Sequence, residues 1–433
     1  MTSSDDILAR LMSFHPQYIG PELGRVHRLL ESLGNPQKKL PPVVHIAGTN
    51  GKGSTLATLR GLFEASGKTV HAFTSPHLVH YHERFYIAGA NIAEEALVEV
   101  LEECEEANNG EEITHFELTA VAAFHAYTKT PADVLLLEVG LGGTWDATNV
   151  IDNPALSIIT PVALDHQQFL GEDIPTIATD KAGILKPGCP AVIAEQSDEA
   201  LDAIRKCAEE KNVDLKVFGH DFTVYEEHGR MVYQDEDGLL DLPLPVLLGR
   251  HQISNAGTAI AALRALPNLV PEPAYEAGLR ATTWPARFER LKEGTLLDLA
   301  GPGAELWLDG GHNPHCGAAL AETVAGLEER NPRPLYIITG MMQRKDAGGF
   351  LGAFEGLAKE VHTLDVPDTE SSHTADELAD IARAVGLTAS PTTSLEQALK
   401  SIAQKEKNPR ILICGSLYLA GHALRLNAQG LKV

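Results

Sequence analysis

The segment from Gly48 to Ser54 combines glycines, a lysine and hydroxyl side chains in the order that phosphate binding requires. It follows the apolar run Val43–Ala47 and precedes a helical pattern over residues 55–65. In such a loop, backbone N–H groups point at an anion, the lysine reaches the outer phosphates and a hydroxyl ligates Mg²⁺. The loop is shorter than G-x-x-x-x-G-K-[ST], and Gly53 separates Lys52 from Ser54. A simple strand–helix turn is the alternative, but the agreement in order predicts a nucleoside triphosphate site.

Polar side chains also follow the other predicted strands, where ligands of parallel sheets bind. Glu138 closes an otherwise apolar run, and a carboxylate there is costly unless it is paired or ligates a cation. Together with Ser75 and His166 it predicts a Mg²⁺ site that faces the phosphates. Taken singly, Ser75 could cap a turn before Pro76, and His166 could be an ordinary loop histidine.

Other chemistries are less well supported. The histidines at 77, 80 and 82 could suggest zinc, but their spacing lies in a loop and we do not favour it. The sequence has no G-x-S-x-G motif and no cysteine in a catalytic context. This absence suits phosphoryl transfer, which depends mainly on positioning and charge neutralisation.

The C-terminal part of the chain repeats the pattern of polar groups after an apolar strand. Asp309 to His315 follows the run Leu306–Leu308, and Gly249 to Ala256 opens a helix that could present polar groups to a base or ribose. Arg287 supplies a cation beside Pro285, near a predicted hinge.

The elements that position these residues predict an α/β protein with a doubly wound parallel sheet. Short apolar runs alternate with amphipathic helical patterns such as Phe116–Tyr127. Residues 213–245 differ and predict a small antiparallel β insertion. The first group of candidate strands is Val43–Ala47, Thr69–Thr74, Val134–Val139, Leu156–Pro161 and Ala191–Glu195.

We place a domain boundary near Trp284-Pro285, after a helix over Asn255–Leu266. Residues 1–284 would form the ATP-binding domain, and residues 285–433 a smaller Rossmann-like α/β domain. The candidate strands of the second domain are Leu306–Asp309, Leu335–Thr339, Val361–Leu364 and Ile411–Cys414.

Composition restricts the function classes. The 433 residues include 44% apolar and 22% charged residues, as in an ordinary soluble enzyme. A formal charge of −24 argues against broad binding of nucleic acid or an anionic membrane. Five widely spaced cysteines, no basic-then-apolar leader and no long apolar run predict a cytoplasmic protein.

The order of these motifs resembles bacterial folylpolyglutamate synthase/dihydrofolate synthase, within the Mur-type amide ligases. The matching segments span about residues 45 to 416, and together they are far more specific than any one alone. They are Gly48 to Ser54, Thr74 to Leu78, His115 to Glu117, Leu137 to Gly143, Asp146 to Asn149, Leu164 to His166, Lys181 to Ile184, His251 to Ala256, Pro285 to Phe288, Asp309 to Pro314, and Gly415 with Ser416.

The resemblance implies a role for each matching residue. Lys181 matches a lysine that is carboxylated on Nζ and assists the metal site, and the catalytic set would be Lys52, His166, Lys181, Arg287 and His312. The ATP contacts would be Gly48, Thr49, Asn50, Gly51, Lys52, Gly53, Ser54, Asn255, Arg287 and Asp309, with the last two closing over the nucleotide. The metal ligands would be Ser54, Ser75, Glu138 and His166, and the pterin pocket would include Leu23, Gly24, Trp145, Asp146 and Ala147.

The implied activity is ATP-dependent addition of L-glutamate to dihydropteroate or to the glutamate tail of a folate, through an acyl phosphate. ATP and one or two Mg²⁺ ions are expected, together with a monovalent cation. The partners are small molecules only, and a monomer is usual in the family. Three departures from the family pattern stand at Thr144-Trp145, Gly311 and His82.

Two alternatives remain open. A UDP-muramyl peptide ligase shares the ATP loop, but such enzymes typically have an N-terminal UDP domain, whereas about 42 residues precede the first strand here. A nucleotide-binding scaffold without catalysis would be expected to lack Lys52, Glu138, Lys181 or His312, and all four are present.

Overall fold

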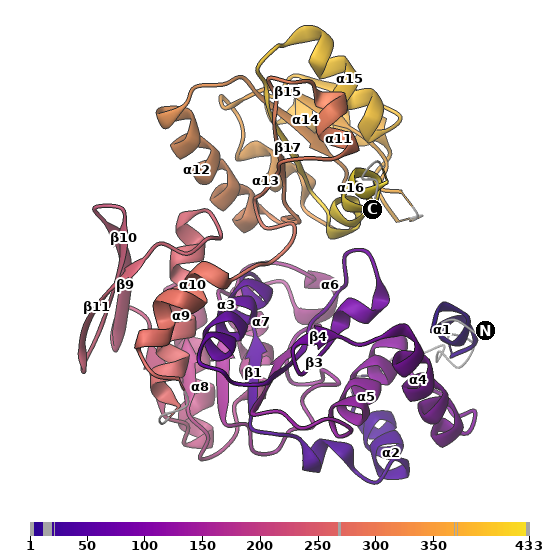
Figure 1. Cartoon of the computed structure of the whole chain (residues 1–433), viewed down its shortest axis with the longest axis vertical. Coiled ribbons are helices and arrows are strands. Elements are labelled where there is room, and N and C mark those ends of the chain that lie inside the picture. The colour runs from indigo at the N-terminus through magenta and orange to yellow at the C-terminus, as the bar shows by residue number, and fades with distance from the viewer. Residues whose placement is uncertain are drawn as a thin grey trace. The chain divides into compact units, whose positions relative to one another are not determined.

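A computed structural model describes residues 4–11, 20, 22–266, 270–367, 369 and 371–429, which separate into two compact units (Figure 1). The N-terminal unit consists of the described residues up to Val246 together with Ile253–Thr283. The C-terminal unit consists of Leu247–Gln252 and the described residues from Trp284 onward. The chain therefore crosses between the units three times.

The N-terminal unit is built on an eight-stranded sheet in the order β4-β3-β2-β5-β1-β6-β7-β8. The six neighbouring strands β2, β5, β1, β6, β7 and β8 pair in parallel. At one side of the sheet, β3 and β4 add an antiparallel edge. The bounds are β1 Val43–Ala47, β2 Val70–Phe73, β3 Phe85–Ile87, β4 Ala90–Asn91, β5 Val134–Glu138, β6 Leu156–Ile159, β7 Ala191–Ile193 and β8 Leu215–Val217.

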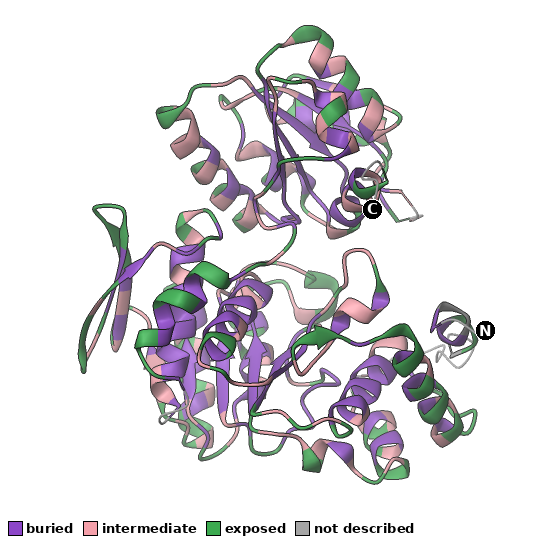
Figure 2. Ribbon diagram, viewed as in Figure 1, coloured by how far each residue is buried: buried purple, intermediate pink, exposed green. Residues whose placement is uncertain are grey.

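Helices cover both faces of this sheet because its central strands are apolar on both sides. Val44 and Leu136 pack in the core beneath α3, α9 and α10, whereas Val43 and Leu135 pack on the side of α2, α4 and α5 (Figure 1). Figure 2 shows the resulting buried strands. The helices are α1 Ser4–Leu11, α2 Gly24–Ser32, η2 Pro36–Lys39, α3 Lys52–Ala65, η3 Tyr81–Arg84, α4 Glu94–Asn108, α5 His115–Tyr127, α6 Gln167–Leu170, α7 Ile174–Lys181, η4 Ala182–Ile184, α8 Asp198–Lys211, α9 Arg250–Ala265 and α10 Pro273–Ala281.

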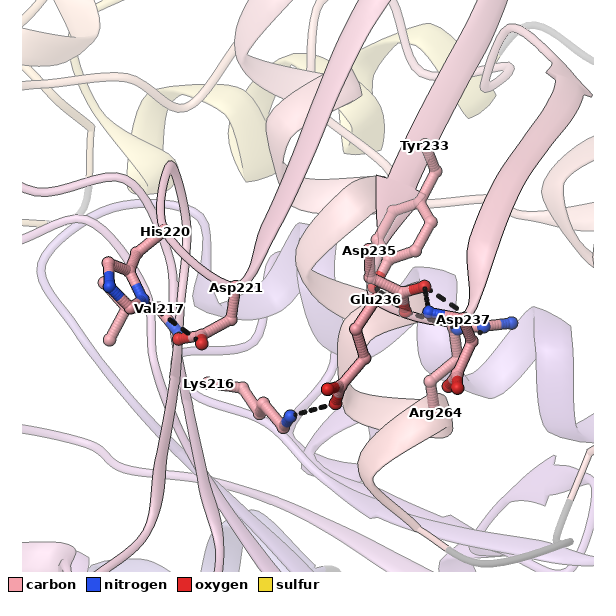
Figure 3. Close-up of polar contacts among 9 residues, drawn as sticks. All are labelled: Lys216, Val217, His220, Asp221, Tyr233, Asp235, Glu236, Asp237 and Arg264. Carbon is pink, nitrogen blue, oxygen red and sulfur yellow. Dashed lines mark hydrogen bonds and ion pairs between the residues drawn. The ribbon is translucent and has the colours of Figure 1, made fainter.

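A separate three-stranded antiparallel sheet follows β8 and packs against α9. It consists of β9 Phe222–Glu227, β10 Arg230–Asp235 and β11 Gly238–Pro243. Figure 3 shows its ionic anchors: Arg264 of α9 lies 2.6 Å from the Asp235 carboxylate, and Lys216 of β8 lies 2.6 Å from that of Glu236. The predicted β insertion is confirmed, with one correction. Val217 belongs to β8 of the main sheet, because Leu215–Val217 pairs in parallel with β7.

The C-terminal unit contains a six-stranded sheet in the order β12-β13-β17-β14-β15-β16. Only the β12–β13 pair is antiparallel among these strands. The strands are β12 Glu289–Leu291, β13 Glu305–Leu308, β14 Leu335–Thr339, β15 Ala358–Thr363, β16 Ala389–Pro391 and β17 Arg410–Cys414. The helices are α11 Thr295–Ala300, α12 Pro314–Arg330, α13 Ala347–Gly352, α14 Ala375–Ala384, α15 Leu395–Lys405 and α16 Leu417–Ala428.

The predicted fold class is therefore confirmed: a doubly wound parallel sheet with a β insertion, and a second, smaller α/β unit. Within the described residues, each helix is too short or too polar to cross a lipid bilayer.

Candidate nucleotide and metal site

The segments that were predicted to carry the chemistry follow four neighbouring strands of the N-terminal sheet. These strands lie in the order β2-β5-β1-β6 and are parallel, so their carboxyl ends share one edge. Ser75 follows β2, Glu138 ends β5, the loop from Gly48 follows β1, and His166 follows β6. The topology thus brings the residues of the predicted site to a single edge.

The loop Gly48–Gly51 requires glycine at two positions. Gly51 is the N-cap of α3 with φ 85°, and a Cβ built there would lie 2.5 Å from Asn255 Oδ1. A Cβ on Gly48 (φ 147°) would lie 1.9 Å from Thr160 Oγ1. Because the N-cap Gly51 has no side chain that could cap the helix, the N–H groups of the first turn of α3 suit an anion. Asn255, a predicted ATP contact, therefore lies against this loop.

The loop is also fastened to the segment after β6. The N–H groups of Thr49 and Asn50 donate to the Pro161 carbonyl at 3.0 and 3.1 Å. The Thr49 hydroxyl lies 3.1 Å from both the carbonyl oxygen and the amide nitrogen of Ala163. This segment leads directly to Asp165 and His166, so these hydrogen bonds fix the position of the phosphate loop relative to the His166 loop.

Two lysines share one carbonyl oxygen of the phosphate loop. Lys52 Nζ donates to the Gly48 carbonyl at 3.0 Å, and Lys181 Nζ donates to the same oxygen at 3.1 Å. Lys181 is only 4% exposed. Its burial, followed by the nearby charge of Lys52, lowers the pKa of Lys181 to about 7, although Asp180, Asp165 and Asp146 oppose the shift. Burial and the neighbouring cation thus shift Lys181 toward the neutral amine.

The chemistry of the donor set fits Mg²⁺. Glu138 is buried, and its Oε2 accepts a hydrogen bond from the Ser75 N–H at 3.2 Å, so these two residues come together as predicted. Within the part of the chain that is described, no three His, Cys, Asp or Glu side chains converge as a metal site. Mg²⁺ commonly binds through one or two carboxylates, with phosphates and water completing its shell, so the buried Glu138 carboxylate next to Ser75 suits it.

His166 lies at the same edge in a different environment. It has a left-handed backbone (φ 52°) as the N-cap of α6, and its imidazole is 42% exposed. Its Nε2 lies 4.0 Å from the Asp165 carboxylate. A metal contact that His166 shares with Glu138 stays a prediction.

The predicted substrate residues after β5 have contrasting surroundings. Asp146 is buried and accepts four hydrogen bonds, from the N–H groups of Gly140, Leu141 and Thr148 and from the Thr148 hydroxyl. Ala147 packs in the core, whereas Trp145 is 55% exposed. Asp146 thus organises the loop that presents Trp145.

The remaining predicted substrate residues, Leu23 and Gly24, lie at the start of α2. Leu23 packs against the core of the N-terminal unit, and Gly24 is exposed. A substrate contact by either residue stays a prediction.

In the C-terminal unit, Asp309 and Arg287 form a second cluster. The buried Asp309 accepts hydrogen bonds from Phe288 N (2.7 Å) and Gly311 N (2.6 Å), which holds the backbone next to Arg287. Burial raises the pKa of Asp309, and the Arg287 charge opposes the rise. Ala286 and Phe288, on either side of Arg287, have φ of 54° and 44°, an uncommon conformation that often marks functional positions.

Histidines add to this cluster, and two of them, His251 and His315, were not among the predicted site residues. His312 Nδ1 lies 2.8 Å from the Gly310 carbonyl oxygen. The pKa of His251 is lowered to about 4 by burial and then by the charges of His315 and Arg287, which places these side chains near one another. The signal for His251 was its place in the segment Gly249–Ala256, directly before the predicted ATP contact Asn255.

Comparison with known protein families defines the class. The Mur ligase middle domain matches residues 46–263, and the Mur ligase glutamate ligase domain matches residues 287–417. The fold and the phosphate loop thus belong to a Mur-type ligase.

Individual relatives narrow the class. The Escherichia coli protein named dihydrofolate synthase/folylpolyglutamate synthase is 32% identical, over 97% of this chain and 94% of its own length. A Halobacterium salinarum protein named probable bifunctional folylpolyglutamate synthase/dihydropteroate synthase is 35% identical over 91% of this chain, which spans only 48% of that relative. The structure of E. coli FolC in complex with DHPP and ADP superposes with a TM-score of 0.87 at 30% identity, covering 98% of this chain and 97% of that one.

The chain therefore belongs to the dihydrofolate synthase/folylpolyglutamate synthase family of ATP-dependent ligases. This result decides against the UDP-muramyl ligase alternative. A structure named bifunctional folylpolyglutamate synthase/dihydrofolate synthase with Mn, AMPPNP and L-glutamate bound is also similar, with a TM-score of 0.86, 28% identity and 98% of each chain covered.

Proposed function

We propose that this ligase joins L-glutamate to dihydropteroate and to the glutamate tail of a reduced folate. In the first step, an acceptor carboxylate oxygen attacks the γ-phosphorus of ATP, and the bond to the β,γ-bridging oxygen breaks, giving an acyl phosphate and ADP. In the second step, the neutral amine of glutamate attacks the acyl carbon. The C–O bond to phosphate then breaks, phosphate leaves with the electron pair and the amine proton passes to solvent.

The N-terminal unit would bind the triphosphate. The N–H groups of the first turn of α3 suit an anion, and Lys52, now hydrogen-bonded to the Gly48 and Thr49 carbonyls at 3.0 and 3.3 Å, can exchange these neutral acceptors for phosphate oxygens. Ser54, Ser75, Glu138 and His166 would hold Mg²⁺, which when bound neutralises phosphate charge. A second Mg²⁺ and a monovalent cation belong to the proposal as well.

The observation that carries the proposal is the buried Lys181 beside the phosphate loop. We infer that its neutral amine is carboxylated by CO₂. The Nζ lone pair attacks the carbon of CO₂, one C=O electron pair moves to oxygen, and Nζ releases a proton to solvent. The product is an anion, and an anion can orient Mg²⁺ where an ammonium cannot. An ordinary lysine would be neutral in only about one molecule in 10³ at pH 7, which makes the lowered pKa of Lys181 relevant.

The C-terminal unit would contribute Arg287, Asp309 and His312. Asp309 fixes the backbone at Phe288 and so presents Arg287, whose planar guanidinium suits two phosphate oxygens at once. His312 is held by the Gly310 carbonyl and would orient the reacting groups.

The remaining proposals concern the substrate and the protein as a whole. Trp145, the exposed aromatic of its loop, suits the planar pterin or benzoyl ring, with Asp146 holding the loop in place. The five cysteines are free thiols, which supports a reducing, cytoplasmic location. A monomer that binds no nucleic acid is in keeping with the charge of −24.

The test is glutamate-dependent phosphate release from ATP, measured separately with dihydropteroate, with tetrahydrofolate and with no pterin. The proposal expects release with both acceptors, no release without glutamate, and loss of release in Lys52→Ala. Release with only one acceptor would restrict the enzyme to that reaction. Release with neither acceptor would contradict the proposal.

A further inference from the structure

The turn after Lys181 decides where its amine can reach. Lys181 is the last residue of α7, and η4 (Ala182–Ile184) follows at once. The side chain must extend from this turn to the Gly48 carbonyl, 3.1 Å from Nζ. A small rotation of the turn would therefore move Nζ away from the phosphate loop.

A second lysine, distant in sequence, holds this turn. Lys211 is the last residue of α8, and its Nζ donates to the carbonyls of Ala182 (3.3 Å), Gly183 (3.4 Å) and Leu185 (3.0 Å). An ammonium group has three donors, so this arrangement uses all of them. Burial lowers the pKa of Lys211, which shows that placing its charge here carries a desolvation cost.

The opposite side of the turn is held by the loop after β5. The Thr144 N–H and hydroxyl donate to the Asp180 carbonyl at 2.9 and 3.0 Å, and Asn149 Nδ2 lies 3.4 Å from the Gly183 carbonyl. A Cβ on Gly183 would lie 2.1 Å from Thr144 Oγ1, so the two segments are in close contact. Lys211 thus holds the turn from the α8 side, and the loop after β5 holds it from the other.

The turn is also joined to the ends of the central strands. Ile184 forms a small buried cluster with Ala47 and Val139, the residues directly before Gly48 and directly after Glu138. Lys211 therefore holds a segment that packs against the residue before the phosphate loop and the residue after the predicted metal carboxylate.

We propose that Lys211 is a positioning residue that holds Lys181 in the orientation in which its amine takes up CO₂. The inference rests on the proposed carboxylation of Lys181. Without Lys211, three carbonyls of the turn lose their common donor, the turn samples more conformations, and Nζ occupies the reactive position less often. The carboxylated form is then less populated at a given CO₂ concentration, and more CO₂ restores it by mass action.

The experiment uses the full chain and two readouts. Activity is titrated with bicarbonate in degassed buffer containing carbonic anhydrase, and the carbamate is detected by ¹³C NMR after exchange with ¹³C-bicarbonate. The variants are Lys211→Met, Lys211→Gln and Lys211→Arg. Lys206→Met is the matched control, because Lys206 is an exposed lysine of the same helix.

For Lys211→Met we expect the bicarbonate concentration at half-maximal activity to rise by about 10-fold, the scale on which removing a supporting residue is felt. Activity at saturating bicarbonate should stay within about 3-fold of the wild type, because mass action refills the same site. Lys211→Gln should shift in the same direction, Lys211→Arg should recover most of the shift, and Lys206→Met should match the wild type.

A purely structural role would lower activity by the same factor at every bicarbonate concentration, and that result would overturn the proposal. An unchanged titration in Lys211→Met would overturn it too, and Lys211→Gln decides the matter if Lys211→Met does not fold. If the wild type shows neither a ¹³C carbamate signal nor a dependence of activity on bicarbonate, the result would instead contradict the carboxylation of Lys181, on which the inference depends.

Discussion

Each unit contains a buried long basic side chain near an end of its parallel sheet, Lys181 in the N-terminal unit and Arg410 in the C-terminal unit, and the two have very different partners. Arg410, 1% exposed, begins β17 of the C-terminal unit and lies at the amino end of that sheet. Its guanidinium donates to the carboxylates of Glu305 (3.1 Å) and Glu328 and to the Asn331 carbonyl (3.0 Å). Lys181, 4% exposed, lies near the carboxyl edge of the N-terminal sheet, and its Nζ hydrogen bond is to a neutral carbonyl that Lys52 also uses.

The difference separates a structural cation from a reactive amine. A buried guanidinium with two carboxylate partners fixes the ends of neighbouring strands, here β13 and β17. A buried lysine beside another cation is pushed toward its neutral form, and a neutral amine is a nucleophile. Burial alone does not distinguish the two; the type of side chain and its partners do.

The largest effect on turnover should come from Lys181→Met. We expect glutamate-dependent phosphate release to fall by about 10³-fold, at the upper end of losses for one preorganised catalytic group. The free energy of unfolding should be unchanged or higher, because an apolar chain of similar size replaces a desolvated amine. Lys186→Met, a half-buried lysine of the same region, is the control. A variant that keeps full activity would contradict the role of Lys181.

Arg410→Met should show the opposite pattern. We expect the free energy of unfolding to fall by about 3 kcal/mol, the lower end of the range for breaking a buried pair. The lower end applies because Arg333 and Arg290 also lie near Glu305, at 3.4 and 3.7 Å. Urea unfolding gives the free energy, and turnover per folded molecule should stay near that of the wild type. A loss of turnover without a loss of stability would erase the contrast with Lys181.

Arg287→Ala tests the second cluster. We expect turnover to drop by at least ~10²-fold, or about 2.7 kcal/mol of transition-state stabilisation. The fold should remain intact, because the hydrogen bond that Arg287 Nη1 donates within the described residues is to the carbonyl of its neighbour, Ala286, at 2.9 Å. Arg290→Ala, a more exposed arginine on β12, is the matched control. Near-normal activity in Arg287→Ala would refute the assigned role.

The smallest expected effect is a shift of the pH profile of carboxylation. At fixed CO₂ pressure, carbamate on Lys181 should increase as the pH rises through about 7, because the protonated amine below this pKa cannot attack CO₂. Since Lys52 helps to lower the pKa of Lys181, Lys52→Met should move the rise to higher pH. The measurement is the ¹³C carbamate signal, which does not require turnover. A rise near pH 10, as for an exposed lysine, would contradict the burial argument.

The sequence predicted the central strands well. The bounds of β1 and β14 agree to the residue, because each is a mostly apolar run that begins after a proline and ends before a glycine. The start of α9 was placed at Asn255 instead of Arg250, since its first turn is polar and gives no helical periodicity. Short strands such as β12 were not predicted, because a strand of three residues is too short to show an alternation of apolar and polar residues.

The candidate site could be predicted where residues of reactive type lie directly after a strand in the sequence. The loop Gly48–Ser54 and Glu138 are local patterns at strand ends, and parallel pairing then brings them together. Lys211 has no local signal, because its contacts with Ala182, Gly183 and Leu185 cross at least 26 residues of chain. Asp146 is the reverse case, because it has a clear signal in the sequence as part of a motif that resembles the family. In the structure its carboxylate accepts hydrogen bonds from its own loop, and its contact with substrate stays a prediction.

The most direct test of the central claim is a high-resolution electron-density map of the ATP-bound enzyme, crystallised with bicarbonate at pH 7.5 or above. The account predicts planar carboxyl density joined to Nζ of Lys181, in place of its present hydrogen bond to the Gly48 carbonyl. A bare amine or ammonium on Lys181, still bonded to Gly48 or paired with Asp180, would contradict it.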